Sequence, residues 1–87
     1  MRIFLQQPPQ AGEPPRYYQI RLEQDLLGGW VLTREWGQPG QRSSSRREVF
    51  LARDEALRAL EKARDSQLRR GFRVMFAQGM GDPHAAA

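Results

Sequence analysis

The sequence predicts a small α+β domain in which one long helix packs on one face of an antiparallel β-sheet. Two runs of alternating residues flank the pair Gly28-Gly29, which is typical of a β-hairpin. A later run, Arg53–Arg70, repeats its apolar residues with helical spacing. Because a helix and a sheet each present one apolar face, stacking them in two layers buries both. A length of 87 residues is enough for one such domain.

The N-terminal part begins with a short apolar segment, Arg2–Gln6, which we expect to form an edge strand. Four prolines fall in Gln7–Pro15, and this stretch is predicted to be a loop because proline lacks the backbone donor that a sheet needs. We therefore assign residues 1–15 to a short strand and a Pro-rich arm. The main domain is expected to span residues 16–76.

Residues 17–23 and 30–36 alternate in the way that half-buried antiparallel strands do. One face of the first run carries three apolar side chains: Tyr18, Ile20 and Leu22. One face of the second run carries four side chains: Trp30, Leu32, Arg34 and Trp36. A further strand is expected at Arg46–Leu51, after a polar loop, with Val49 and Leu51 on the face opposite Phe50.

The helix is expected over Arg53–Arg70, and its apolar stripe follows i, i+3, i+4 spacing. The stripe consists of Ala56, Leu57, Leu60, Ala63 and Leu68. Ala52 offers no N-terminal cap, whereas Gly71 fits the left-handed residue that often follows a helix, with Phe72 packing back after it. A last strand is expected at Phe72–Phe76, and residues 77–87 are expected to be a disordered tail.

The composition excludes several classes of function. The chain has no cysteine and one histidine, His84, so it lacks the materials for a zinc site or a catalytic triad. No stretch approaches the roughly 18 consecutive apolar residues of a membrane span. The proline-broken start, MRIFLQQPP, is too short for a secretory signal. We therefore expect a cytoplasmic protein with no cofactor, no metal, no membrane attachment and no small-molecule substrate.

The net charge of +4 comes mostly from arginine, which makes up thirteen of the fourteen basic residues. Guanidinium groups suit bidentate phosphate contacts, so the bias fits a nucleic-acid surface. The base composition of the source genome would produce the same bias, and composition does not separate the two explanations. Residues 38–47 form the most concentrated positive segment, with no acidic residue and with Arg42, Arg46 and Arg47.

Several separated segments together resemble the WGR domain family, which is named for a Trp-Gly-Arg tripeptide. They are Tyr17–Ile20, Trp30–Gly37, the helix containing Ala56-Leu57, and Arg70–Arg73, and the resemblance covers about residues 16–74. The family occurs in DNA-damage-dependent poly(ADP-ribose) polymerases and in bacterial proteins, where it stands alone or is fused to other modules. The resemblance implies a non-catalytic domain that clamps a DNA break, with its tryptophan against sugar or base and its basic residues on phosphates.

Three positions depart from the family pattern. Gln38 replaces the name-giving arginine, Phe72 stands where tyrosine is common, and Gln67 stands where lysine is common late in the helix. Glutamine cannot neutralise a phosphate, so any charged contact with phosphate must come from neighbouring arginines. The resemblance and the flanking charge together indicate these nucleic-acid-binding residues: Trp36, Gly37, Gln38, Arg34, Arg42, Arg46 and Arg47.

Structural explanations remain open beside the functional ones. A tryptophan such as Trp36 at a strand end can cap a sheet, and the arginines that follow can be solvated loop charges. Trp30, in the middle of an apolar run, is expected in the core. Glu35 and Glu48 are the carboxylates nearest the motif, and nothing in the sequence pairs them for acid–base catalysis.

Two functions from different classes therefore remain. The first is a nucleic-acid-binding module without catalysis, for DNA ahead of RNA, that prefers ends, nicks or single-stranded regions. The second is a protein-interaction adaptor, in which the exposed edge at Arg2–Gln6 accepts a strand from a protein partner. An enzyme is not expected, because the sequence offers no nucleophile–base pair, metal-ligand set or phosphate-binding glycine loop. Arginines converging on an exposed Trp36 would favour the first function, and a buried Trp36 with diverging arginines the second.

Overall fold

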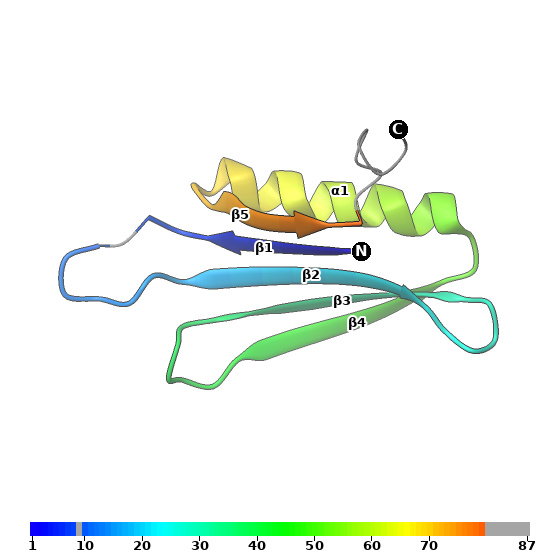
Figure 1. The fold of residues 1–87 in the computed structure, drawn as a ribbon, viewed down its shortest axis with the longest axis horizontal. Helices are drawn as coiled ribbons and strands as arrows, with labels where there is room; N and C mark the ends of the chain where they lie inside the picture. Colours follow the sequence, from blue (N-terminus) through cyan, green and yellow to red (C-terminus); the bar gives the residue numbers. More distant parts are fainter. Residues whose placement is uncertain (9, 80–87) are drawn as a thin grey trace.

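The computed structural model describes residues 1–8 and 10–79 and has five strands and one helix in this range. In chain order, the elements are β1 (Arg2–Gln6), β2 (Tyr17–Gln24), β3 (Trp30–Gly37), β4 (Ser44–Phe50), α1 (Arg53–Arg69) and β5 (Arg73–Gln78). The strands form one antiparallel sheet, and α1 runs lengthwise along it (Figure 1). The predicted α+β class, with one long helix on one face of a small antiparallel sheet, is confirmed.

The order of strands across the sheet is β4-β3-β2-β1-β5. The expectation that Arg2–Gln6 forms an edge strand is wrong, because β1 pairs with β2 on one side and with β5 on the other. Its two inward side chains, Ile3 and Leu5, are essentially inaccessible to solvent. The sheet therefore begins ahead of the Pro-rich segment rather than after it, and its edges are β4 and β5.

The β2–β3 hairpin forms where the glycine pair predicted it. The Asp25 side chain accepts hydrogen bonds from the backbone N–H groups of Leu27 and Gly29, both at 2.8 Å. Gly28 adopts a φ of 89°, a left-handed conformation that glycine tolerates best. The turn leaves Leu26 and Leu27 fully exposed at its tip.

The core lies between α1 and one face of the sheet. Strand register places Tyr18 opposite Trp36, Ile20 opposite Arg34, and Leu22 opposite Leu32, so these side chains share the helix-facing side. The predicted inward faces of β2 and β3 are therefore correct. The core is completed by side chains from β1, from α1 and from the turn that follows α1: Ile3, Leu5, Ala56, Leu60, Ala63 and Phe72.

The buried stripe of α1 differs from the prediction at its last member. Ala56, Leu60 and Ala63 are buried as expected, but Gln67 is buried next, and Leu68 is 42% exposed. The reason is helical geometry, because position 67 lies four residues after Ala63 on the same face, whereas position 68 has rotated toward solvent. One polar side chain thus occupies the apolar stripe.

The end of α1 is a Schellman motif, as the glycine after the helix predicted. The backbone N–H of Phe72 donates to the carbonyl of Gln67 at 3.0 Å, and that of Gly71 donates to Leu68 at 3.1 Å. Gly71 has a φ of 93°. This tight turn directs Phe72 back onto the core, where its ring meets Tyr18 edge to face with centroids 6.2 Å apart.

The C-terminal strand β5 continues to Gln78, so Ala77 and Gln78 belong to the sheet rather than to a tail. The remainder of the expected tail, residues 80–87, and with it His84, lies outside the described residues. In the part of the chain that is described, no helix has the length and apolar character that crossing a bilayer requires.

Candidate functional site

A pocket of about 470 Å³ opens at the end of the sheet where β2 begins, β3 ends and α1 terminates. Its volume falls in the range typical of ligand sites, roughly 300–1,000 Å³. Ten residues from four separate stretches of the chain line it: Gln7, Arg16, Tyr17, Tyr18, Arg34, Trp36, Gly37, Gln67, Arg70 and Phe72. We refer to it as the Trp36 pocket.

Three aromatic side chains form one wall of the pocket. Trp36 stacks on Tyr18 with ring centroids 5.6 Å apart and an angle of 11° between the ring planes. Tyr18 and Trp36 are direct partners in the β2–β3 register, which places their rings side by side. The Schellman turn brings the ring of Phe72 against that of Tyr18. Trp36 is half-buried. Its indole is thus rigidly held while part of its surface still lines the pocket.

Arg34 lies two residues before Trp36 and on the same face of β3. Its Nη2 atom forms an ion pair with Oε1 of Glu48 at 2.8 Å, across the β3–β4 pairing. Its Nε atom is buried without a hydrogen-bond partner in the described part of the protein. The charge that Arg34 brings to the pocket is therefore partly offset by one carboxylate.

Two more arginines border the pocket from segments far from the motif in sequence. Arg16 sits at the base of the β1–β2 loop, where its carbonyl accepts a 2.9 Å hydrogen bond from the backbone of Gln7. Arg70 is the C-cap residue of α1. Both side chains are exposed, so each can reach a ligand without losing a protein partner.

Gln67 closes the pocket from the helix side. The residue is only 6% exposed, yet its side-chain amide makes no hydrogen bond within the described residues. Its amide atoms are not fully shielded from solvent, because the residue borders the open space of the pocket. Gln67 therefore offers one donor and one acceptor to a pocket occupant.

Gly37 ends β3 beside the pocket and allows a close backbone approach. A Cβ atom at this position would lie 3.3 Å from the carbonyl oxygen of Arg42 and 3.3 Å from Cα of Ser43. The missing side chain thus makes room for the β3–β4 loop to fold against the strand end.

Gln38 lies outside the Trp36 pocket. Its Nε2 atom donates to the carbonyl of Pro14 at 3.3 Å, and the residue lines a smaller hollow of about 170 Å³ beneath the Pro-rich loop. The glutamine at the name-giving motif position therefore ties the β1–β2 loop to the end of β3.

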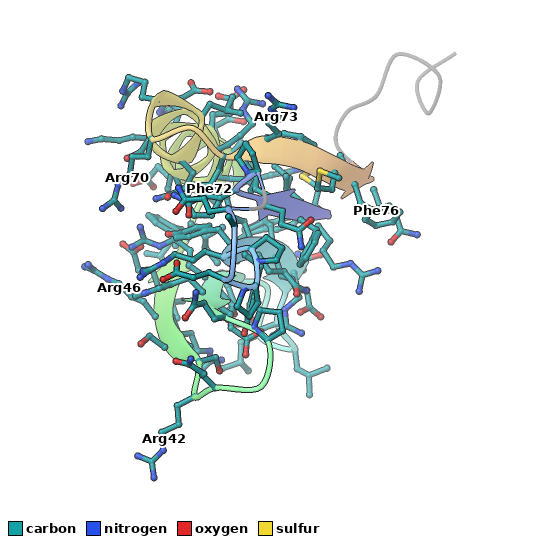
Figure 2. All side chains as sticks on the ribbon, turned by 90° about the vertical axis from the view of Figure 1, so that its left-hand side faces the viewer. Arg42, Arg46, Arg70, Phe72, Arg73 and Phe76 are labelled. Carbon is teal, nitrogen blue, oxygen red and sulfur yellow. The ribbon has the colours of Figure 1, made fainter. Side chains whose placement is uncertain are left out.

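The other three arginines predicted for the site do not line the pocket. Arg46 is the register partner of Arg34 and shares its face of the sheet, whereas Arg47 pairs with Thr33 and lies on the opposite face. Arg42 projects from the β3–β4 loop, away from Arg46 and Arg70, which extend from one side of the molecule (Figure 2). Trp36 is half-buried, and of the four arginines predicted to surround it only Arg34 lines the pocket, beside Arg16 and Arg70.

Sequence reasoning missed the members of the pocket that lie outside the motif. Arg16 directly precedes the Tyr17-Tyr18 pair, and Arg70 directly precedes Gly71, so each adjoins a recognised segment. The signal that could have identified both is their place at the ends of elements that meet at Trp36.

The lining residues determine what chemistry the pocket can support. It has three guanidinium groups, two amides and the rings of Tyr18, Trp36 and Phe72, and none of its ten lining residues is a carboxylate, histidine, serine or cysteine. Within residues 1–8 and 10–79, no three His, Cys, Asp or Glu residues come together as a metal-ligand group. The side chains of the pocket therefore suit a flat, anionic group.

Comparison with known proteins gives one match. The family model described as WGR domain matches residues 1–77 of the chain. No curated protein and no solved structure matches it.

Proposed function

The chain belongs to the WGR domain family, and from that premise we propose that it is a non-catalytic nucleic-acid-binding module. In this proposal the Trp36 pocket receives a terminal or unpaired nucleotide of a DNA strand. The family is often linked to nucleic-acid binding, and in proteins related to poly(ADP-ribose) polymerases the WGR domain is a non-catalytic module.

The observation that carries the proposal is the pairing of arginine with aromatic rings in a pocket lined by no carboxylate. Arginine neutralises phosphate and releases condensed counterions, which drives binding at low salt. An aromatic ring that contacts a base or sugar adds sequence-independent affinity, about 1–3 kcal/mol per stacked base. A nucleotide presents both kinds of group within one residue of its chain.

The shape of the site favours ends and unpaired regions over intact duplex. In a continuous duplex both faces of each base are covered by its neighbours, so a recessed indole such as Trp36 has no base face to meet. At a strand end, a nick or a single-stranded stretch, one base or sugar becomes free to enter the pocket. The preference for DNA over RNA comes from the family, in which the domain accompanies DNA-damage-dependent enzymes.

Each polar group has a role in this proposal. Arg16 and Arg70 hold the phosphates that flank the bound nucleotide, because both are exposed at the rim. Gln67 hydrogen-bonds the occupant from the helix side, because its amide borders the pocket and makes no side-chain hydrogen bond within the described residues. Arg46 extends from the same side of the molecule as Arg70 (Figure 2). It therefore continues the positive surface along the DNA strand that leads away from the pocket.

Fluorescence anisotropy with labelled DNA tests the proposal. The ligands are a blunt duplex and a covalently closed dumbbell of the same sequence, which has no ends, each at two salt concentrations. We expect tighter binding to the blunt duplex and weaker binding at the higher salt. Absence of binding at low salt, or equal affinity for both ligands, would contradict the proposal.

Matched variants locate the site. Arg70→Gln and Arg69→Gln remove the same charge from neighbouring exposed positions, but only Arg70 lines the pocket. We expect Arg70→Gln to weaken binding more and to lower the salt slope by about 0.9, the contribution of one duplex phosphate contact. Equal effects of the two variants would argue for diffuse attraction instead of a site.

The protein-adaptor alternative relied on a free edge at Arg2–Gln6. That strand is paired on both sides, so a partner strand would have to add to β4 or β5 instead. The β5 edge exposes the apolar side chains of Val74, Met75 and Phe76, so it is the edge that such a partner would meet. A nuclease-insensitive, stoichiometric protein partner in a pull-down would nevertheless revive the adaptor function.

A further inference from the structure

The face of the sheet opposite α1 carries an aromatic and basic surface that the Trp36 pocket does not use. Register and strand alternation place on this face the side chains of Arg2 and Phe4 from β1, Gln19 and Arg21 from β2, and Phe76 from β5. Phe76 lies on the side of the molecule opposite Arg46 and Arg70 (Figure 2). We call this set of five residues the open-face platform.

The platform is ordered although it is exposed to solvent. Phe76 is 45% exposed, and the guanidinium carbon of Arg2 lies 5.4 Å from the centre of its ring. Phe4 stacks against Tyr17 with centroids 6.1 Å apart and an angle of 18° between the rings. Together with Gln19, the residues Arg2, Phe4 and Phe76 line a shallow hollow of about 340 Å³. The rings are thus held in place and face an open space.

The charge on the platform is unbalanced. Arg2 and Arg21 are direct partners across β1 and β2, and like charges in that position destabilise a sheet. Neither forms an ion pair within the described residues. None of the five platform residues is acidic. An anion lying between the two guanidinium groups would relieve their repulsion.

Exposed rings with adjacent arginines on a sheet face are the elements by which proteins bind single-stranded nucleic acid. Unpaired bases stack on the rings, guanidinium groups meet phosphates, and amides such as that of Gln19 can contact base edges. Two carboxylates share this face, Glu23 beside Arg21 on β2 and Glu35 opposite Gln19, but neither forms an ion pair with an arginine of the platform within the described residues. The arginine pair thus stays open to a polyanion, and the adjacent rings favour one with flat apolar groups.

We propose that the open-face platform is a second contact surface, which binds single-stranded nucleic acid. An unpaired base enters the hollow beside Phe76 and Phe4, and the adjoining phosphates lie at Arg2 and Arg21. The surface is independent of the Trp36 pocket, because none of its five residues lines that pocket. DNA and RNA share the chemistry that the platform recognises, and the experiment distinguishes them.

The test measures the anisotropy of labelled oligothymidylate and oligouridylate of roughly 15 nucleotides, near the upper site size of single-strand binders. Phe76→Ala removes the exposed ring, and Phe76→Leu keeps apolar bulk without the aromatic face. We expect both variants to weaken binding at least about fivefold, the lower limit for one lost stacking contact. If the Phe76 variants bind both oligomers more weakly, the platform recognises chemistry that DNA and RNA share. If they bind only one oligomer more weakly, the platform is specific for that class of nucleic acid.

The matched control is Val49→Ala, an exposed apolar residue on the same face but on the far edge strand β4. We expect it to bind like the unmodified protein. For charge, Arg2→Gln should lower the salt slope by about 0.7, one single-strand phosphate, whereas Arg58→Gln, at an exposed position of α1 on the other side of the sheet, should not. Circular dichroism on each variant verifies that the sheet is intact.

The outcomes separate this surface from the pocket. If Phe76→Ala weakens binding of the oligomers and leaves binding of the blunt duplex intact, the platform is supported whether or not the pocket binds DNA. If Arg70→Gln weakens oligomer binding and the two Phe76 variants do not, single strands bind at the pocket and the platform proposal is overturned. Failure of the unmodified protein to bind either oligomer at low salt overturns it as well.

Discussion

Replacing Glu48 with glutamine should strengthen nucleic-acid binding, because Glu48 offsets the charge of an arginine in the Trp36 pocket. The carboxylate lies 2.8 Å from Nη2 of Arg34 and does not itself line the pocket. In Glu48→Gln, the amide oxygen can still accept the same hydrogen bond. The guanidinium group therefore keeps its position and regains its full charge toward a phosphate.

The expected size of this effect follows from the charges that surround the pocket. Three arginines line it and one carboxylate opposes them, so the substitution acts like adding one phosphate contact. Each such contact changes the salt slope by about 0.9, so the gain in affinity should differ by about eightfold between two salt concentrations tenfold apart. The side chains of the pair are 21% and 34% exposed, so its loss should destabilise the fold by less than about 1 kcal/mol.

The assay is anisotropy with the blunt duplex across a salt series. Glu61→Gln, at an exposed position of α1 outside the pocket, makes the same change in net charge and should leave the slope nearly unaltered. Adding Glu48→Gln to an Arg34→Gln protein should give no further gain, because the carboxylate then has no guanidinium group to offset. Equal gains from Glu48→Gln and Glu61→Gln, or an unchanged slope with Glu48→Gln, would refute the reasoning.

Three further predictions concern the stability of the fold, each measured by thermal or denaturant unfolding. Gly71→Ala should lower the free energy of unfolding by about 1–2 kcal/mol, because φ is 93° at this position. The cost is purely conformational, since nothing lies within 4 Å of the new Cβ atom. Gly71→Asn should lower it less, and equal losses for the two variants would contradict this explanation. Gly37→Ala should cost about 1 kcal/mol from crowding against the β3–β4 loop backbone, and an unchanged midpoint would mean that the loop yields freely. Leu27→Ser should change stability by less than about 0.5 kcal/mol, because Leu27 is fully exposed; a larger loss would imply a contact that the fold does not have.

Local patterns were enough to predict most of the fold. The alternation around Tyr18, Ile20 and Leu22 identified the buried face of β2, because side chains in a strand point alternately to its two faces. The end of α1 was equally readable, since Gly71 supplies a conformation that few other residues tolerate. Extending the stripe to Leu68 rather than Gln67 was an error of one position on the helical wheel.

The place of β1 could not be read from the same patterns. A five-residue strand with an apolar centre fits an edge or an interior position equally well, and the choice depends on whether a later strand pairs with its free side. Here β5 supplies that partner from more than sixty residues away, a distance over which local propensity carries no information.

The sequence by itself determined the α+β class, the elements and their buried faces, and the presence of a Trp36-Gly37 motif in a basic chain. It did so because these features depend on residues that are close neighbours along the chain. Only the tertiary structure decided which arginines surround Trp36. Arg16, Arg34 and Arg70 come together because the start of β2, the end of β3 and the end of α1 meet at one end of the sheet. The alternation of the strand turns Arg47 to the other face, although it lies closer to Trp36 in sequence than Arg16 or Arg70 does.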